Sequence, residues 1–242
     1  MQRHAFVTGG SGGIGSAICR MLAAQGNTVT VADLDEVGAK ELAAELGGLA
    51  VALDVTDGTS IKTAVAQAVA ANGPVQILVN CAGWERTTAL TDMDDEHITR
   101  IIDINLTGLI RITREVVAPM VATGWGRIVN VSSDAARSGA ATYTVYSAAK
   151  AGVNSFTKSL AHEVGYSGVT VNAMSPGAID TPLLRSSQGE NVEFVLDYLK
   201  DNIPLGRIGT PDEAAAIVAF FASDAASYVT GQVLSVNGGL SR

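Results

Sequence analysis

A regular alternation of short apolar segments with longer helical ones is the feature that most constrains the fold of this chain. Residues 4–8 and 28–32 are runs of mostly apolar or β-branched side chains, and residues 14–25 and 36–46 follow them with apolar side chains at helical spacing. Strands that alternate with helices in this way form successive βαβ units, which place the strands in a parallel sheet. Because the strand segments show little polar alternation, we expect helices to cover both faces of that sheet.

The same alternation continues along the rest of the chain. It predicts a single α/β domain over residues 1–242, with about seven strands in a doubly wound parallel sheet. Further strands are predicted at residues 49–53, 75–79, 127–131, 169–173 and 232–236, and further helices at residues 60–71, about 94–120, 142–164 and 212–222.

One segment, between Pro176 and Pro211, interrupts the alternation. Small and polar residues at 186–189 precede an amphipathic stretch at residues 192–199, and no strand pattern is present. Ligands of open α/β sheets bind beyond the carboxyl ends of the strands, so an insertion after a strand is placed to cover a ligand. We therefore expect a substrate lid over about residues 178–210, with a surface excursion of no function as the alternative.

The composition limits the partners of the chain. Lys and Arg number 16 and Asp and Glu 24, which gives a net charge of −8, and 47% of the residues are hydrophobic. This balance predicts a folded domain and argues against nucleic acid, whose phosphates are bound mainly by Lys and Arg. Two cysteines are too few for a disulfide framework, no leader pattern precedes Ala5, and the longest apolar run, residues 214–222, is about half a bilayer span. We expect a soluble, cytoplasmic protein without a membrane partner.

The first predicted strand runs directly into a glycine-rich turn, residues 8–15, with the sequence TGGSGGIG. Glycines let the backbone approach a ligand closely, and the N–H groups at the start of the following helix can hold a pyrophosphate without Lys or Arg. A tight strand-to-helix turn without a ligand is the alternative. The residues expected to contact a dinucleotide here are Gly9, Ser11, Gly13, Ile14 and Gly15.

Asp33 follows the second predicted strand, 18 positions after Gly15, which is close to the spacing of an acidic residue that binds the adenosine ribose. A carboxylate at this position repels a 2′-phosphate, and neither Gly12 nor Leu34 offers a cation to bind one. Asp33 and Leu34 are therefore candidate cofactor contacts, and NAD is favoured over NADP. The alternative role for Asp33 is to cap the helix that begins near Asp35.

The third and fourth predicted strands also end in polar residues, on the edge along which a dinucleotide would extend. Asp54 has acceptor oxygens for an adenine amino group, and capping of the helix near Asp57 is an equally open role. Cys81 has no cationic neighbour and no second Cys at metal spacing, so it is expected to be a small buried residue and not a nucleophile. The candidate contacts on these segments are Asp54, Val55, Asn80, Ala82 and Gly83.

Tyr146 and Lys150 are four positions apart near the start of a predicted helix, so they share one helix face. The pKa of an isolated tyrosine is about 10, which leaves about one phenolate in 10³ at pH 7. A nearby ammonium and a positively charged nicotinamide favour the anion, and a pKa shift of roughly 3 units, or about 4 kcal/mol, would let Tyr146 exchange a proton with an alcohol or carbonyl. Ser132 and Ser133 end the preceding strand, where a hydroxyl can hold the substrate oxygen. The Tyr-x-x-x-Lys spacing alone is a weak signal, because many helices contain it by chance.

Together these motifs resemble those of the short-chain dehydrogenase/reductase family, in its single-domain branch of about this length. The resemblance implies a Rossmann-like fold and a nicotinamide cofactor, which Asp33 narrows to NAD. It spans the chain and rests on Thr8-Gly9-x-x-x-Gly13-x-Gly15, Asn80-x-Ala82-Gly83, Asn105, Ser133, Tyr146-x-x-x-Lys150, Pro176-Gly177, Gly231-Gln232 and Asn237-Gly238-Gly239.

The resemblance also implies roles for individual residues. Tyr146 is similar to the family's acid/base residue, Lys150 to the lysine that lowers the tyrosine pKa and binds the nicotinamide ribose, and Ser133 to the serine that orients the substrate. Asn105 resembles the asparagine that holds a proton-relay water, with a buried Asn satisfied by backbone as the alternative. The segment that positions the nicotinamide carboxamide corresponds to Pro176, Gly177, Ile179 and Thr181.

Two further expectations concern metals and assembly. His4, His97 and His162 are scattered without metal-ligand spacing, so no metal is expected. Family members of this length are commonly homotetramers that pair the helices corresponding to residues 94–120 and 142–164, so the resemblance implies a homotetramer. Cys81 stands where the family often has a second asparagine. Because this position usually faces the interior, the difference does not weaken the resemblance.

The leading hypothesis is an NAD(H)-dependent oxidoreductase that interconverts a secondary alcohol and a ketone, with oxidation as the favoured direction. Residues 80–84 and 133–137 are similar to members that act on cyclic hydroxyacyl-CoA thioesters. The general pattern also resembles 3-oxoacyl carrier-protein reductases, which usually prefer NADPH, a preference that Asp33 counts against. A non-catalytic NAD sensor is a third hypothesis, but a sensor would not need Ser133, Tyr146 and Lys150 together.

Overall fold

The computed structural model describes residues 2–187 and 192–241. Within these residues, seven strands form one sheet in the order β3-β2-β1-β4-β5-β6-β7, and every neighbouring pair is parallel. The predicted doubly wound parallel sheet is thereby confirmed. The strands are β1 (His4–Thr8), β2 (Thr28–Asp33), β3 (Leu49–Ala52), β4 (Ile77–Asn80), β5 (Gly126–Val131), β6 (Val169–Pro176) and β7 (Val233–Val236).

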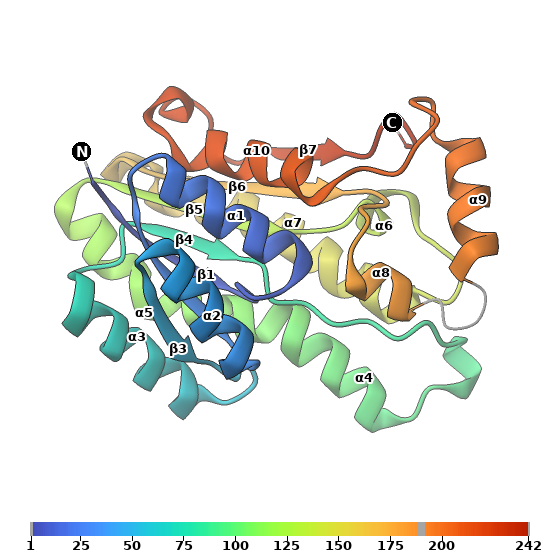
Figure 1. The fold of residues 1–242 in the computed structure, drawn as a ribbon, viewed down its shortest axis with the longest axis horizontal. Helices are drawn as coiled ribbons and strands as arrows, with labels where there is room; N and C mark the ends of the chain where they lie inside the picture. The colour runs from blue at the N-terminus through green and yellow to red at the C-terminus, as the bar shows by residue number, and fades with distance from the viewer. Residues whose placement is uncertain (1, 188–191, 242) are drawn as a thin grey trace.

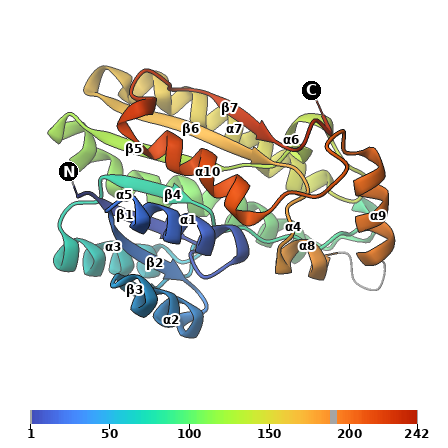
Figure 2. The ribbon, with the colours of Figure 1, turned by 45° about the horizontal axis from the view of Figure 1, so that its top comes forward.

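Helices cover both faces of the sheet (Figures 1 and 2). Neighbouring residues of β1 point to opposite faces of the sheet. Val7 packs in the core on one face and Phe6 in the core on the other, and both are fully buried. Apolar side chains are therefore required on both sides of a strand, which explains the continuous apolar runs in the sequence. One face is covered by α1 (Gly13–Ala24), α2 (Glu36–Leu46) and α10 (Pro211–Ala222), and the other by α3 (Gly58–Asn72), α5 (Gly108–Thr123) and α7 (Thr144–Val164).

The strand order reverses at the centre of the sheet. From β1 the chain moves to one edge through β2 and β3, and it then returns to β4 on the other side of β1. Such a reversal separates the loops that follow the two strands and leaves a crevice for a ligand. In Figure 1 the carboxyl ends of the strands point to the right, toward α8 (Pro182–Ser187) and α9 (Val192–Asn202).

The region predicted as a helix over about residues 94–120 is helical but is not one regular α-helix. α4 (Asp95–Ile102) continues through a π-helical turn, Asp103–Thr107, into α5. Asn105 lies inside this turn and is 1% exposed. Because π-helical turns occur frequently at functional sites, this turn indicates a functional role for the helix layer around Asn105.

Aspartate side chains cap the N-termini of α2 and α3, the helices that follow β2 and β3. Asp35 accepts a hydrogen bond from the Gly38 N–H (3.1 Å) at the start of α2, and Asp57 accepts one from the Thr59 N–H (2.8 Å) at the start of α3. The alternative interpretations, in which Asp33 and Asp54 cap these helices, are therefore wrong. Both carboxylates remain available for other roles.

The interruption between Pro176 and Pro211 contains α8 and α9. The amphipathic stretch at residues 192–199 falls within α9, which buries Leu196. Residues 188–191 of the expected lid lie outside the described residues. The remaining short elements are α6 (Ala135–Ser138) and the 3₁₀ turns Leu90–Asp92, Gly165–Ser167 and Asp224–Ala226. No helix in residues 2–187 or 192–241 is long and apolar enough to cross a membrane.

Candidate active site

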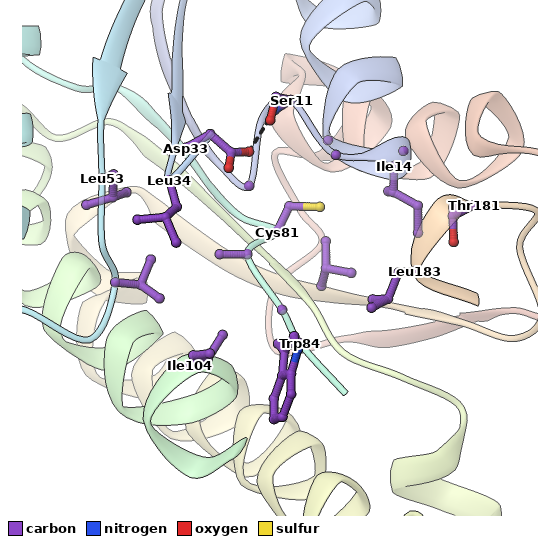
Figure 3. A pocket seen from close by; sticks show the side chains of 18 of the residues that line it. Ser11, Ile14, Asp33, Leu34, Leu53, Cys81, Trp84, Ile104, Thr181 and Leu183 are labelled. Atoms are coloured by element: carbon purple, nitrogen blue, oxygen red, sulfur yellow. Dashed lines mark hydrogen bonds between the residues drawn. The ribbon is translucent and has the colours of Figure 1, made fainter. Parts of the chain in front are cut away.

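A cleft of about 380 Å³ lies at the carboxyl ends of the strands, where the strand order reverses (Figure 3). In Figure 3 Leu34 and Leu53 lie on one side of it, and Thr181 and Leu183 on the other. Asn80, Gly177 and Ile179 are predicted cofactor contacts that do not line it. The predicted contacts that it does bring together are Gly9, Ser11, Gly13, Ile14, Gly15, Asp33, Leu34, Asp54, Val55, Ala82, Gly83, Tyr146, Lys150, Pro176 and Thr181.

The glycine turn leaves no room for side chains on its inner surface. Gly9 has a φ of +62°, and a Cβ there would lie 2.8 Å from the Cα of Ala82. A Cβ at Gly13 would lie 2.9 Å from the Thr181 side chain. The turn is therefore packed directly against two other segments of the cleft.

The first turn of α1 fits an anionic group. α1 begins at Gly13, and its N-cap Gly12 has no side chain to occupy the N–H groups of that turn. The free N–H groups and the positive end of the helix dipole favour a phosphate at this place. The donor set thus fits the pyrophosphate of a dinucleotide.

Asp33 lies at the end of β2, beside the glycine turn. Its carboxylate accepts hydrogen bonds from the Ser11 N–H (2.9 Å, dashed in Figure 3) and the Asp35 N–H (3.1 Å). Since a carboxylate has about four acceptor positions, two remain for hydroxyl groups of a ligand. Asp33 is therefore fixed in place by the turn that would hold the pyrophosphate, and Leu34 beside it is 73% exposed.

Asp54 lies one strand farther along the same edge. One carboxylate oxygen accepts hydrogen bonds from the Thr56 N–H (2.8 Å) and the Thr56 hydroxyl (2.7 Å). The other oxygen is not engaged by these two donors, and Asp54 and Val55 both line the cleft. The position suits an acceptor for an adenine amino group, as the sequence predicts.

The side chain of Asn80 is directed into the core and not into the cleft. Asn80 is 3% exposed, and its Nδ2 donates to Thr113 (3.1 Å) and Asn130 (2.9 Å). The loop that follows is held by Thr8, whose hydroxyl accepts hydrogen bonds from the Cys81 N–H (3.1 Å) and the Ala82 N–H (3.0 Å). Asn80 thus anchors the start of this loop to the core.

Cys81 differs from the prediction in one respect. It lines the cleft and is partly exposed, so it is not a core residue. Burial of the thiol nevertheless raises its pKa to about 12. The thiol is therefore neutral at ordinary pH, which does not favour nucleophilic attack.

Asn105 connects the π-helical turn to the loop after β4. Its Nδ2 donates to the carbonyl oxygens of Trp84 (2.7 Å) and Ile101 (2.9 Å), and its Oδ1 accepts from the Trp84 N–H (3.4 Å). The alternative of a buried Asn satisfied by backbone therefore describes its contacts. These contacts fix the backbone of Trp84 from both its N–H and its carbonyl.

Lys150 reaches the cleft from α7. Its Nζ donates to the carbonyl oxygen of Val131 (2.9 Å) and lies 5.7 Å from the centre of the Tyr146 ring. Burial lowers the pKa of Lys150 to about 8, so the ammonium form prevails at pH 7. The predicted sharing of one helix face by Tyr146 and Lys150 is thus seen directly in the structure.

Tyr146 is partly buried, and desolvation has a larger effect on the pKa of its phenol than any other influence. Burial raises the pKa of Tyr146, the hydrogen bond with Ser133 lowers it, and the charge of Glu85 raises it. The chain's own groups therefore keep the phenol protonated at pH 7. A shift toward phenolate requires a further positive charge, such as that of an oxidised nicotinamide.

The two serines after β5 have different surroundings. Ser132 lines the first cleft and donates to the Lys150 carbonyl oxygen (3.2 Å), so its hydroxyl is engaged with α7. Ser133 lines a second cavity, of about 320 Å³, together with Tyr146. This arrangement favours Ser133 as the substrate-orienting serine, in agreement with the family resemblance.

The second cavity adjoins the first, and α8 and α9 form part of its wall. Gly177 and Ile179 line it, as do Val195 and Leu199 of α9. The two cavities share five residues, Ile14, Tyr146, Pro176, Thr181 and Leu183. Tyr146 is thus accessible from both, which is the position required of a group that contacts a substrate beside a cofactor.

Two charged residues of the site have no counterpart in the sequence predictions. Glu85 lines the second cavity, and Arg100 lines the first with its guanidinium 4.4 Å above the Trp84 ring. Glu85 follows the Asn80–Gly83 motif closely, but its neighbours in sequence show no periodicity that predicts burial. In the structure Glu85 shares the wall of the second cavity with Ser133 of the loop after β5 and Tyr146 of α7.

The fold and the site define an α/β oxidoreductase with a cleft that fits a dinucleotide beside Tyr146 and the buried Lys150. A family model described as "Enoyl-(Acyl carrier protein) reductase" matches residues 9–241. The chain belongs to the short-chain dehydrogenase/reductase family, whose members bind a nicotinamide cofactor and interconvert CH–OH and carbonyl groups.

Similar proteins include both reductases and dehydrogenases. The chain is 42% identical to a 3-oxoacyl-[acyl-carrier-protein] reductase FabG of Vibrio harveyi, over 98% of this chain and 96% of that protein. It is 38% identical to a 2-dehydro-3-deoxy-L-rhamnonate dehydrogenase (NAD(+)) of Sphingomonas sp., over 98% and 94%. The solved structure of a single-residue variant of actinorhodin polyketide ketoreductase with NADPH superposes with a TM-score of 0.95 at 36% identity, over 99% and 97%.

Proposed function

We propose that this protein is an NAD(H)-dependent dehydrogenase that oxidises a secondary alcohol to a ketone. The observation that carries the choice of NAD is Asp33, whose carboxylate lies at the end of β2 and is tied to the glycine turn through the Ser11 N–H. A 2′-phosphate at this place would meet a negative charge, whereas ribose hydroxyls would find a hydrogen-bond acceptor.

The named relatives include proteins of both cofactor preferences, so the choice depends on this chain's own residues. The Sphingomonas relative is named as an NAD(+) enzyme, and the polyketide ketoreductase was solved with NADPH. Among the described residues that line the first cleft, Arg100 and Lys150 are the basic ones. Lys150 is engaged with Val131 beside Tyr146, and Arg100 stacks on Trp84, so neither is placed beside Asp33 by these contacts.

The chemistry assigned to the chain is proton transfer and positioning. When bound, NAD supplies a hydride acceptor and a positive charge near the tyrosine. Tyr146 accepts the proton of the alcohol O–H while the carbinol C–H bond breaks with its electron pair, and the C–O bond becomes a carbonyl. Ser133 donates a hydrogen bond to the substrate oxygen, and Lys150 favours the phenolate through its ammonium charge. In the reverse direction Tyr146 returns the proton to the carbonyl oxygen.

The second cavity is proposed to hold the substrate, with α8 and α9 as the lid. Residues 178–187 and 192–210 of the expected lid are described, and Leu183, Val195 and Leu199 from them line the cavity. An apolar wall of this kind suits a cyclic alcohol or the acyl part of a hydroxyacyl thioester. Reduction of a 3-oxoacyl carrier-protein thioester is the competing proposal, favoured by the similarity to FabG proteins.

The assembly is proposed to be a cytoplasmic homotetramer that pairs α4, α5 and α7 between subunits. α5 exposes Ile110 (38%) and Val121 (37%), which an interface would cover. Light scattering of the purified protein would give the mass of a tetramer under this proposal and the mass of a monomer if it is wrong.

A substrate panel tests the proposed function. The protein is mixed with NAD or NADP and a set of cyclic and aliphatic secondary alcohols, and with NADH or NADPH and the matching ketones, including a 3-oxoacyl thioester. We expect NADH to form from NAD with at least one alcohol. Rapid reduction of the thioester with NADPH and no alcohol oxidation would favour the competing proposal. Tight NAD binding without turnover of any compound would identify a sensor.

A further inference from the structure

Glu85 carries the least satisfied charge of the substrate half of the site. The residue is 6% exposed, and neither carboxylate oxygen has a hydrogen-bond partner among the described residues. Burial of a carboxylate without a partner is costly, because water no longer solvates the charge. The cost falls when the carboxyl group takes up a proton or when a ligand supplies the missing donor.

Glu85 forms part of the wall of the second cavity, beside the reacting centre. Glu85 lines this cavity together with Ser133 and Tyr146, and its charge acts on the Tyr146 phenol. A ligand that reaches the Tyr146 hydroxyl therefore also passes close to Glu85.

The described lining of the cavity holds no basic side chain that could pair with Glu85. Asp134 also lines it, but its carboxylate accepts hydrogen bonds from Ser235 (3.1 Å), Asn237 (2.8 Å) and Ser241. No Lys or Arg is found among the described residues of the lining. An anionic group of a substrate would therefore meet two carboxylates and no cation among the described lining residues, whereas the buried oxygens of Glu85 lack a donor that a hydroxyl or an amine could supply.

The backbone on either side of Glu85 is fixed by long-range contacts. Trp84 is held at its N–H and its carbonyl by Asn105, and the Trp84 ring contacts Arg100 (4.4 Å) and His97 (5.4 Å). On the other side, the Thr88 N–H donates to the Thr142 carbonyl oxygen (3.3 Å). The carboxylate is thus presented by a segment anchored to the π-helical turn and to the start of α7, which favours a defined contact with a ligand.

We propose that Glu85 is a specificity residue and that the preferred substrate is a secondary alcohol with a second hydrogen-bond donor, a hydroxyl or an amine. Glu85 accepts the hydrogen bond of this second group while Tyr146 and Ser133 hold the reacting oxygen. This inference rests on the proposed function, because it deepens the description of the same site. Burial raises the pKa of Glu85 to about 7, against an opposing effect of the adjacent Arg86 backbone, so a donor that binds the carboxylate also favours its charged form.

The test uses matched substrates built on the alcohol that the panel shows to be oxidised fastest. That alcohol is compared with its analogue carrying a vicinal hydroxyl and with its analogue carrying a vicinal amine. For the wild-type protein we expect kcat/KM to be at least about tenfold higher for an analogue with the second donor than for the parent alcohol. Glu85→Leu should bring this ratio close to one.

Two further variants complete the test. Glu85→Gln keeps an acceptor oxygen but loses the charge, so part of the preference for the hydroxyl should remain while that for the amine is lost. Glu163→Gln, which neutralises an exposed carboxylate at the far end of α7, should leave both ratios unchanged. If Glu85→Leu does not fold by circular dichroism, the amine ratio of Glu85→Gln decides.

The outcomes separate this inference from the proposed function. A ratio close to one in the wild-type protein, or a ratio that survives in Glu85→Leu, overturns the role of Glu85 while alcohol oxidation stands. Full retention of the amine preference in Glu85→Gln has the same meaning. If no alcohol in the panel is oxidised, the proposed function itself fails, and this inference fails with it.

Discussion

The two halves of the site are built in different ways. The cofactor half combines backbone groups, the glycine turn and the first N–H groups of α1, with the two carboxylates that follow β2 and β3, and the sheet positions all of them. The substrate half is made of side chains from the loop after β4, α7, α8 and α9, which meet only in the folded molecule. A local sequence motif is enough to produce the same backbone geometry in different proteins. The side chains of a cavity wall, in contrast, come from segments far apart in the chain. The first half is therefore suited to a shared cofactor and the second to a particular substrate.

The strongest challenge to the cofactor half is Gly15→Ala. A Cβ at Gly15 would overlap the carbonyl oxygen of Gly9, and neither backbone can move without opening the turn. We expect a loss of stability of about 3 kcal/mol or more and a loss of measurable NAD binding, by thermal unfolding and calorimetry.

Gly58→Ala is the matched control for Gly15→Ala. Gly58 begins α3, and a Cβ there meets no atom within 4 Å. We expect unchanged NAD binding and a stability equal to the wild type or higher by about 0.5 kcal/mol. Normal NAD binding by Gly15→Ala would show that the tight turn is not required for the cofactor.

Lys150→Met tests the junction between the halves. The substitution removes the ammonium that lies 5.7 Å from the Tyr146 ring and keeps a long buried side chain. Without this cation the pKa of Tyr146, already raised by burial, rises further. We expect kcat for alcohol oxidation to fall by about 10²-fold or more, and the rise of the rate with pH to shift to higher pH. A pH–rate profile that keeps its wild-type midpoint would contradict the proposed role of the ammonium.

Asp33→Ala tests how the cofactor half distinguishes NAD from NADP. Removal of the carboxylate removes both the ribose acceptor and the repulsion of a 2′-phosphate. We expect the ratio of kcat/KM for NADP to that for NAD to rise by about 10- to 100-fold. Asp35→Ala is the control, since Asp35 caps α2: it should lower stability by about 1 kcal/mol and leave the ratio unchanged. An unchanged ratio in Asp33→Ala would exclude Asp33 as the residue that selects the cofactor.

Glu85→Gln gives the smallest expected effect and concerns the substrate half alone. Burial raises the pKa of Glu85 to about 7, above its value of about 4.3 in the unfolded chain. The folded state therefore disfavours the charged form, and this cost is absent below about pH 4, grows as the pH rises, and is complete above about pH 7. At pH 8 the variant should exceed the wild type by about 1–3 kcal/mol, or roughly 2–10 °C in Tm. The difference should vanish near pH 4, and a difference that is constant with pH would show that the carboxylate is solvated.

The sequence predicts the cofactor half closely, for reasons that are local. The glycine turn, Asp33 and Asp54 follow directly after strands, so their place at the sheet edge is set as soon as the strands are recognised. The alternation of apolar segments predicts the strands themselves, although β6 continues to Pro176 and α3 begins at Gly58, beyond the predicted limits. Such differences of a few residues arise because caps and hydrogen bonds, and not apolar periodicity, end each element.

The substrate half is predicted less completely, because its parts are joined by contacts between distant segments. Tyr146, Lys150 and Ser133 are recognised through the family resemblance, and the structure brings them together. Glu85 is not recognised, because no local pattern indicates that this charged residue is buried in a cavity wall with Ser133 and Tyr146, which lie far along the chain. Asn80 shows the opposite case: its place in a motif indicates a cofactor contact, yet its side chain lies in the core with Thr113 and Asn130. A motif locates a segment, whereas the direction of each side chain is set by packing.

The central claim is that Tyr146 transfers the proton, while NAD is held mainly by the cofactor half of the site and does not need the Tyr146 hydroxyl. The most direct measurement is the rate of NADH formation by Tyr146→Phe, saturated with NAD and with the best alcohol of the panel, beside calorimetric titration of the same variant with NAD. We expect an NAD affinity within about twofold of the wild type and a turnover lower by about 10³-fold or more. Turnover above about a tenth of the wild-type rate would contradict the assignment of Tyr146 as the acid/base residue.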